Sequence, residues 1–306
     1  MPKDNHDAKP RLMTMAEVLA DMRAARTSPP VELSDLPPLY ATEEIPRTPR
    51  TRPIHDLSGF VKLWMLIGEG NVGKTVVARL LIEKLIAHDR LGQSMVAALA
   101  PGTRNLSDFN ASVYQPPSVD VAATADWAAE RLAAMQALRW GGVWDFGGGD
   151  TTLRMMVDAQ PDMVERSEQE GMAIVAAYLF SPRLDDLAFL RTFERTGFRP
   201  RATALILNLG RADSPSAFND IRNQPEYEAA IDRGAVELWL PPLKPSVARA
   251  IEKARVSFAQ ARDGEAPDGR RAADISPTER VRVREWLMRT EAEFADIEKQ
   301  GWMPWT

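Results

Sequence analysis

The stretch VKLWMLIGEGNVGKT, residues 61–75, decides the fold class of this chain. Residues 61–67 are mostly apolar, as in a buried strand, and they run directly into a glycine-rich segment that ends in Lys74 and Thr75. Within 75–90, Arg79, Glu83 and Arg90 share one face at helical spacing, which predicts a helix there. A strand, a glycine-rich loop and a helix in this order predict one βα unit built around residues 68–75.

Short apolar runs then alternate with helical patterns along the rest of the chain. Apolar runs predict strands at 94–100, 141–146, 172–180, 203–209 and 236–240, and periodic patterns predict helices at 184–196, 246–261 and 277–299. Strands that are apolar throughout are expected where helices cover both faces of a sheet. We therefore predict an α/β fold with a Rossmann-like parallel sheet of about six to eight strands and helices on both faces.

The composition excludes several classes of site. The chain has 306 residues, with 43 acidic residues against 38 Lys and Arg and a net charge of -5, which argues against a uniformly basic nucleic-acid surface. It has no cysteine and three scattered histidines, so a thiolate nucleophile, a zinc site or a Ser-His-Asp triad is not expected. No apolar run is long enough to span a bilayer and none follows the initial Met, so we expect a cytoplasmic protein without a membrane partner.

The chain divides into three predicted parts. Residues 1–57 hold nine of the 23 prolines and are expected to form an extended arm, with one short helix at about 14–26. Residues 58–262 contain the strand and helix patterns and are expected to form the nucleotide-binding domain. Residues 263–306 are expected to form a linker and a helix that begins after Ser276.

The segment 68–75 matches the pattern G-x-x-x-x-G-K-[ST]. Its glycines allow successive N–H groups to point at phosphate oxygens, and the following helix adds the positive end of its dipole. Lys74 is expected to reach the β- and γ-phosphates, and the Thr75 hydroxyl to coordinate Mg²⁺. The alternative is a vestigial loop. We predict a nucleotide site lined by Gly68, Glu69, Gly70, Asn71, Val72, Gly73, Lys74 and Thr75.

A second candidate lies at 143–150, where an apolar strand ends in Asp145 and is followed by glycines. A carboxylate at the end of such a strand fits a residue that holds Mg²⁺ through water. Gly148 is expected to bring a backbone N–H to the γ-phosphate, so that 147–153 acts as a switch segment. The alternative is an ordinary turn after a strand, where Asp and Gly are common.

A third candidate is Asn208, near the end of the run 203–209. The carboxyl ends of strands are where parallel α/β sheets bind ligands, and an amide can both donate to and accept from an adenine edge. A turn-forming asparagine explains the same residue equally well. Both interpretations stay open at the level of sequence.

These three segments, in this order, resemble the ParA/MinD-like ATPases, the deviant-Walker branch of the P-loop NTPases. The core Asn71–Thr75 with its preceding glycine is most similar to the ParA-like proteins that plasmids encode for stable inheritance or conjugative transfer, such as the StbB type. The segment 240–243 is similar to the family's proline-bearing loop, which places Pro241 beside the base. The resemblance implies Mg-ATP as ligand, a homodimer gated by nucleotide, and DNA or a DNA-bound adaptor as partner.

Two positions depart from the family pattern. The family's signature lysine acts across the dimer, and here that position is Glu69. The family also carries an acidic residue at the end of its second strand, whereas 98–105 holds no carboxylate and the first one is Asp108. Hydrolysis requires a positioned water as well as charge neutralisation. With Lys74 and Asp145 as the catalytic candidates, we expect ATP hydrolysis to be slow, stimulated by a partner, or absent.

Four functional classes remain open. The first is a nucleotide-gated switch in plasmid partition, stability or conjugation, and the second is a scaffold that binds nucleotide without turnover. The third is a metabolic enzyme of similar fold, and the fourth is an interaction module without nucleotide. A basic strip within 244–289 is compatible with direct DNA contact, although a solvated helix explains it as well.

Overall fold

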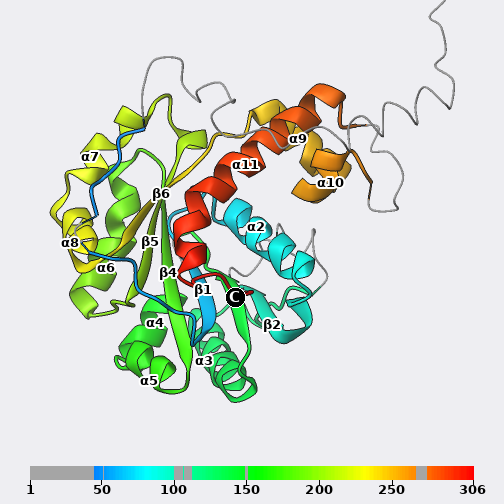
Figure 1. Cartoon of the computed structure of the whole chain (residues 1–306). Helices are drawn as coiled ribbons and strands as arrows, with labels where there is room; N and C mark the ends of the chain where they lie inside the picture. Colours follow the sequence, from blue (N-terminus) through cyan, green and yellow to red (C-terminus); the bar gives the residue numbers. More distant parts are fainter. Residues whose placement is uncertain (1–44, 51, 100–105, 107–111, 149–150, 267–273) are drawn as a thin grey trace, which may run out of the picture. The chain divides into compact units, whose positions relative to one another are not determined.

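The computed structural model describes residues 45–50, 52–99, 106, 112–148, 151–266 and 274–306. A sheet of six strands runs through this part of the chain in the order β2-β3-β1-β4-β5-β6, and every neighbouring pair is parallel (Figure 1). The strands are β1 Val61–Ile67, β2 Ser94–Ala98, β3 Gly141–Asp145, β4 Met172–Phe180, β5 Ala202–Asn208 and β6 Val236–Leu240. The predicted α/β fold with a parallel sheet is confirmed. The helix predicted at 14–26 lies outside the described residues.

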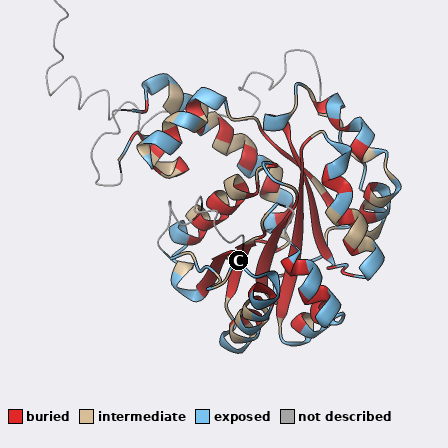
Figure 2. Cartoon of the chain, turned by 180° about the vertical axis from the view of Figure 1, so that it is seen from behind, coloured by how far each residue is buried: buried red, intermediate tan, exposed pale blue. Residues whose placement is uncertain are grey.

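Side chains of each strand alternate between two hydrophobic cores, one on each face of the sheet. In β1, Leu63 and Met65 belong to one core, whereas Trp64 and Leu66 belong to the other. The register Leu63↔Ile174 between β1 and β4 places residues of the same face side by side. Figure 2 shows that the sheet is buried almost throughout while the helices expose their outer sides. Double-sided burial explains why the strands read as continuous apolar runs.

Helices cover both faces. One face is covered by α2 Lys74–Ala87, α9 Pro245–Ala254, α10 Phe258–Asp263 and α11 Pro277–Lys299. The other is covered by α3 Val121–Leu138, α4 Thr152–Ala159, α5 Met163–Gln169, α6 Ala188–Thr196, α7 Asn219–Arg222 and α8 Pro225–Arg233. Short 3₁₀ turns occur at Leu91–Gln93, Leu184–Leu187, Leu209–Arg211 and Pro215–Phe218. Among the described residues, every helix is too short or too polar to cross a membrane.

The helix predicted at 246–261 is two helices in the structure. Arg255 adopts a left-handed conformation (φ 52°) that ends α9, and Ser257 starts α10 with a capping box. The predicted apolar face is nevertheless buried, because Ile251 of α9 and Phe258 of α10 lie in the same core. Periodicity alone did not reveal the break, since both halves present their apolar side to one surface.

A partly buried carboxylate explains where α10 begins. Glu83 of α2 accepts hydrogen bonds from the backbone N–H groups of Phe258 (2.7 Å) and Ala259 (3.1 Å). The first N–H groups of a helix have no partner within the helix, so this carboxylate supplies one from another element. Arg79, one turn earlier on α2, donates to the carbonyl of Val256 (3.1 Å) and lies 4.5 Å from the ring centre of Phe258. The charged face predicted for α2 therefore packs against α10.

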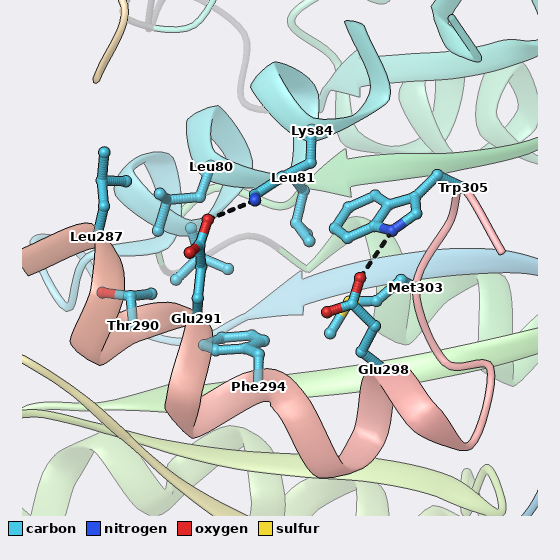
Figure 3. Close-up of a pocket in the computed structure, with 11 residues that line it drawn as sticks. Leu80, Leu81, Lys84, Leu287, Thr290, Glu291, Phe294, Glu298, Met303 and Trp305 are labelled. Carbon is cyan, nitrogen blue, oxygen red and sulfur yellow. Dashed lines mark hydrogen bonds and ion pairs between the residues drawn. The ribbon is translucent and has the colours of Figure 1, made fainter. Parts of the chain in front are cut away.

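Helix α11 packs along α2, and their contact encloses an apolar pocket (Figure 3). Leu81 projects into it from α2, and Phe294 from α11. An ion pair between Lys84 and Glu291 joins the two helices beside this pocket. Residues that lie more than two hundred positions apart in the chain therefore form one layer over the sheet.

The amino ends of the central strands are closed by residues 300–306. Trp302 is fully buried, and its indole N–H donates to the carbonyl of His55 (2.7 Å). The Trp302 carbonyl in turn accepts from the indole N–H of Trp64 (2.7 Å). Lys62, also buried, donates to the carbonyls of Phe60 and Thr306. Trp302 is thus part of the folded core, and the Thr306 carbonyl is bonded to the buried Lys62.

Candidate nucleotide site

The candidate site lies at the carboxyl edge of the sheet. The chain passes from β1 to the sheet edge at β2, returns to β3 beside β1, and then crosses to β4 on the other side of β1. Ligands of open parallel sheets bind beyond the carboxyl ends of the strands, at such a switch point. The loop 68–73 follows β1 and leads into α2, so it occupies this position.

Residues of the glycine-rich loop have positive φ angles, which glycine and asparagine adopt more easily than other residues. Gly73 has φ 107° and precedes the first residue of α2, while Asn71 has φ 64°. A side chain at Gly73 would also collide, because a Cβ there would lie 2.5 Å from the amide nitrogen of Asn208. The N–H groups of Val76 and Val77 both donate to the Gly73 carbonyl, so the helix starts directly at the loop. This geometry directs a helix N-terminus at the site.

Lys74 is buried within the loop. Its ammonium group donates to the carbonyls of Gly68 (2.7 Å) and Glu69 (2.7 Å), and its charge acts to lower the pKa of Asp145. A desolvated ammonium held by neutral carbonyls gains more from a phosphate oxygen, which carries charge. The arrangement therefore fits a lysine that exchanges loop carbonyls for a bound anion.

Asp145 ends β3, next to β1, and accepts a hydrogen bond from the Thr75 hydroxyl (3.2 Å). Burial raises the pKa of Asp145 to about 6, although Lys74 and the Thr75 hydroxyl both act to lower it. A hydroxyl and a carboxylate are hard oxygen donors, and Mg²⁺ at phosphate sites takes one or two protein oxygens besides phosphate and water. The two residues therefore fit a magnesium ion. Within the described residues, no cluster of three or more acidic or histidine side chains offers another metal site.

The segment after β3 touches the glycine-rich loop 68–73, which we call the phosphate loop after its sequence motif. Gly148 lies against Gly70 so closely that a Cβ on Gly148 would be 2.3 Å from the Gly70 nitrogen and 2.9 Å from the Glu69 carbonyl carbon. A residue with a side chain would force the two loops apart, so the contact requires glycine. Residues 149–150 lie outside the described residues, and α4 starts at Thr152. The predicted γ-phosphate contact at Gly148 is thus next to the loop that it was expected to serve.

Asn208 ends β5 and is buried. Its amide nitrogen donates to the carbonyl of Val72 (2.7 Å), and its amide oxygen accepts from the N–H of Gly210 (2.9 Å). The second bond is that of a turn-forming asparagine. The first links β5 to the phosphate loop across 136 positions of sequence, and no local signal in the sequence could have indicated it.

The loop that follows β6 lies beside this asparagine. Leu240 pairs with Asn208 in the sheet, and a Cβ on Gly210 would lie 3.7 Å from Pro242. Pro241 is buried, and its carbonyl accepts a hydrogen bond from the indole of Trp286 in α11 (2.9 Å). The structure therefore brings Pro241 to the same edge of the sheet as Asn208 and the phosphate loop.

The structure describes only part of the surfaces that the sequence assigned to hydrolysis and to DNA. The segment 98–105, where the family pattern carries an acidic residue, is described only to Leu99. Asp108 lies outside the described residues. In the basic strip, Lys253 pairs with Asp274 (2.9 Å) and Arg262 with Asp263 (2.7 Å). Such pairs are typical of a solvated helical surface.

No protein-family model matches the sequence, and no curated protein matches it either. Among solved structures, the chain is similar to chloroplast FtsY from Physcomitrella patens (14% identity, TM-score 0.39), to FtsY from Mycoplasma mycoides (14%, 0.38) and to the signal recognition particle receptor FtsY from Elizabethkingia anophelis in complex with GDP (11%, 0.37). The alignments cover 65%, 62% and 64% of this chain. They span less than two thirds of each FtsY chain: 62%, 63% and 60%.

Proposed function

We propose that this protein is a P-loop nucleotide-binding switch that takes Mg-ATP at residues 68–75. The observation that carries the proposal is the pairing of this loop with Asp145: Thr75 at the start of α2 lies 3.2 Å from the carboxylate that ends the neighbouring strand β3. An ammonium group, a hydroxyl, a carboxylate and a helix N-terminus then meet at one edge of the sheet. That set matches what a triphosphate and its magnesium ion require.

We further propose that the switch belongs to the ParA-like ATPases, with the StbB type as the nearest resemblance, and acts in plasmid partition, stability or conjugative transfer. The support is the sequence order of the phosphate loop, Asp145 and the proline loop at 240–243, now placed at one edge of a parallel sheet. In this proposal residues 58–262 form the ATP-binding domain, and 1–57 and 263–306 are its extensions. DNA or a DNA-bound adaptor is the proposed partner.

The proposed switching element is the contact between Gly148 and Gly70. A γ-phosphate in the loop competes for the space and the N–H groups at this contact, so it shifts the segment that begins at Gly148. A second copy of the chain that binds only one arrangement of this segment makes dimerisation depend on the nucleotide.

Replacing Lys74 with Ala tests the proposal. We expect K74A to lower the affinity for Mg-ATP at least a hundredfold and to abolish nucleotide-dependent dimerisation, measured by titration calorimetry and by size exclusion with light scattering in ATP, ADP and no nucleotide. The matched control is K84A on the same helix, where the lysine pairs with Glu291 away from the loop. ATP affinity within a few-fold of the original in K74A overturns the assignment of the loop, and a constant mass overturns gated dimerisation.

A second candidate function is a scaffold that holds nucleotide without hydrolysing it. Glu69 favours it, because a carboxylate stands where the family's catalytic lysine is expected and its own backbone carbonyl already binds Lys74. The described end of β2 also carries no carboxylate, since Ala97 and Ala98 are its last residues and Leu99 follows directly. ATP turnover measured with and without DNA separates the two functions, since robust basal hydrolysis eliminates the scaffold.

A further inference from the structure

One side chain of β5, that of Asn208, is hydrogen bonded to the phosphate loop. The amide nitrogen of Asn208 is 2.7 Å from the Val72 carbonyl, and Gly73 leaves just enough room for it, since a Cβ there would be 2.5 Å from that nitrogen. Val72 itself is buried, and its side chain lies against Gly68, whose Cβ would be 3.1 Å from it. The loop 68–73 is thus bound to β5 at Val72, its penultimate residue.

The hydrogen bond between Asn208 and the Val72 carbonyl determines which way the neighbouring Gly73 N–H points. The peptide bond between Val72 and Gly73 is planar and trans, so its carbonyl and its N–H point in opposite directions. With the Val72 carbonyl directed at β5, the Gly73 N–H is directed away from β5. The Asn208 amide therefore sets the orientation of a donor in the loop rather than acting only as a contact for a ligand.

The same amide presents little to a base. Its oxygen is bonded to the Gly210 N–H, its nitrogen to the Val72 carbonyl, and the side chain is buried. Each of the two atoms keeps one further N–H or lone pair. Burial of the side chain, however, leaves that remaining capacity little access to a base. The geometry favours an effect on the phosphates over an effect on the base.

We propose that Asn208 is a positioning residue of the phosphate loop, which contributes to binding of the triphosphate group and not to selection of the base. The proposal rests on the nucleotide-binding function above and adds to it how a distant strand controls the loop. Removing the Asn208 amide leaves the Val72 carbonyl without its hydrogen-bond donor and lets the Val72–Gly73 peptide rotate. Every ligand that carries the triphosphate then loses the same part of its affinity.

The test uses ligands with and without a base. We expect Asn208→Ala to weaken Mg-ATP, Mg-GTP and magnesium tripolyphosphate by the same factor, about tenfold. The ratio of ATP to GTP affinity stays unchanged. Asn208→Ser is the more selective variant, because a serine hydroxyl can still accept from the Gly210 N–H but is too short to reach Val72. We expect it to give the same uniform loss.

Thr203→Val is the matched control. Thr203 is buried on the same strand at its amino end, and its hydroxyl donates to the Pro200 carbonyl (2.8 Å). The substitution removes a comparable hydrogen bond of β5 far from the phosphate loop. The affinities for Mg-ATP, Mg-GTP and magnesium tripolyphosphate should therefore stay unchanged. In the ligand-free protein, amide hydrogen exchange of peptides covering 68–76 should accelerate in both Asn208 variants and not in this control.

The outcomes separate cleanly. A loss of ATP and GTP affinity with tripolyphosphate unaffected, or a changed ratio of ATP to GTP, overturns the positioning role in favour of base reading. Unchanged affinities in Asn208→Ser also overturn it. If the unaltered protein binds none of the three ligands, the proposed nucleotide site fails instead. Should a variant not reach the folded state, the exchange rates of the other variant decide the question.

Discussion

The two ends of the same parallel sheet are built in opposite ways. At the amino end, Trp302 is fully buried and is hydrogen bonded to His55 and to the buried indole of Trp64 from the middle of β1. At the carboxyl end stand glycines, a buried ammonium group and a carboxylate whose pKa burial raises to about 6. One end stabilises the fold by burying large apolar side chains, and the other holds charged groups out of water, which costs stability.

A left-handed backbone occurs at the carboxyl end of the sheet, as it also does near the helix ends at Asp89, Arg139 and Arg255. Asn71 adopts φ 64° in the phosphate loop, a conformation that non-glycine residues rarely take. Such positions persist only where surrounding structure enforces them, and they gather at functional sites. The hydrogen bond from Asn208 to the carbonyl of Val72, the residue after Asn71, supplies part of that enforcement.

Replacing Trp302 with Ala is expected to have the largest effect on stability. The substitution leaves a cavity and removes the indole bond to His55, at a cost of about 3–5 kcal/mol, or a fall in melting temperature of roughly 10 °C. Thermal denaturation followed by circular dichroism measures it. ATP affinity of the folded protein should not change, because the change is at the opposite end of the sheet.

Trp305→Ala is the control for this prediction. Trp305 is only partly buried, stacks on His88 at 5.4 Å and donates to Glu298 (3.1 Å). Its loss should therefore cost much less stability. Equal effects of the two substitutions, or reduced ATP affinity in folded Trp302→Ala, would break the contrast between the two ends.

Replacing Gly148 with Ala tests the carboxyl end. The added Cβ would meet the Gly70 backbone at 2.3 Å, so the two loops must separate at a cost of about 1–3 kcal/mol. We expect Mg-ATP affinity to fall about tenfold with a small change in melting temperature. Gly59→Ala is the control, since nothing lies within 4 Å of a Cβ there. Unchanged affinity in Gly148→Ala would show that the contact is not part of the site.

Replacing Asp145 with Asn is expected to stabilise the ligand-free protein slightly. The folded state raises the pKa of this carboxyl from 3.8 to about 6, so the fold prefers the protonated form and loses stability as the pH rises through this range. The variant avoids that loss. We expect it to melt a few degrees higher at pH 7.5 without magnesium, and the difference to shrink towards pH 4.

The same variant should bind ATP without dependence on magnesium, which calorimetry with and without the metal would detect. A lower melting temperature at both pH values would contradict the assignment of Asp145 as a desolvated group. In that case the carboxyl end would not differ from the amino end in the way described above.

The sequence by itself determined the elements whose signals are local. The strands at 61–67, 172–180 and 236–240 were predicted with the boundaries that the structure has, because double-sided burial makes them almost entirely apolar, with Lys62 and Glu237 as charged exceptions. The helix at 277–299 was predicted from its capping box and proline. The loop at 68–75 and Asp145 were found from motif spacing, since glycine, lysine and a strand-ending carboxylate are required by phosphate chemistry.

Only the tertiary structure decided how distant residues complete these elements. The Val72–Asn208 hydrogen bond, the Glu83 carboxylate that starts α10 and the burial of Trp302 each join segments separated by more than one hundred positions. Sequence patterns report which face of an element is apolar, but not which partner satisfies a given polar group on it. That choice depends on the packing of the whole chain, because a buried donor or acceptor can be satisfied by any element that folding brings within reach.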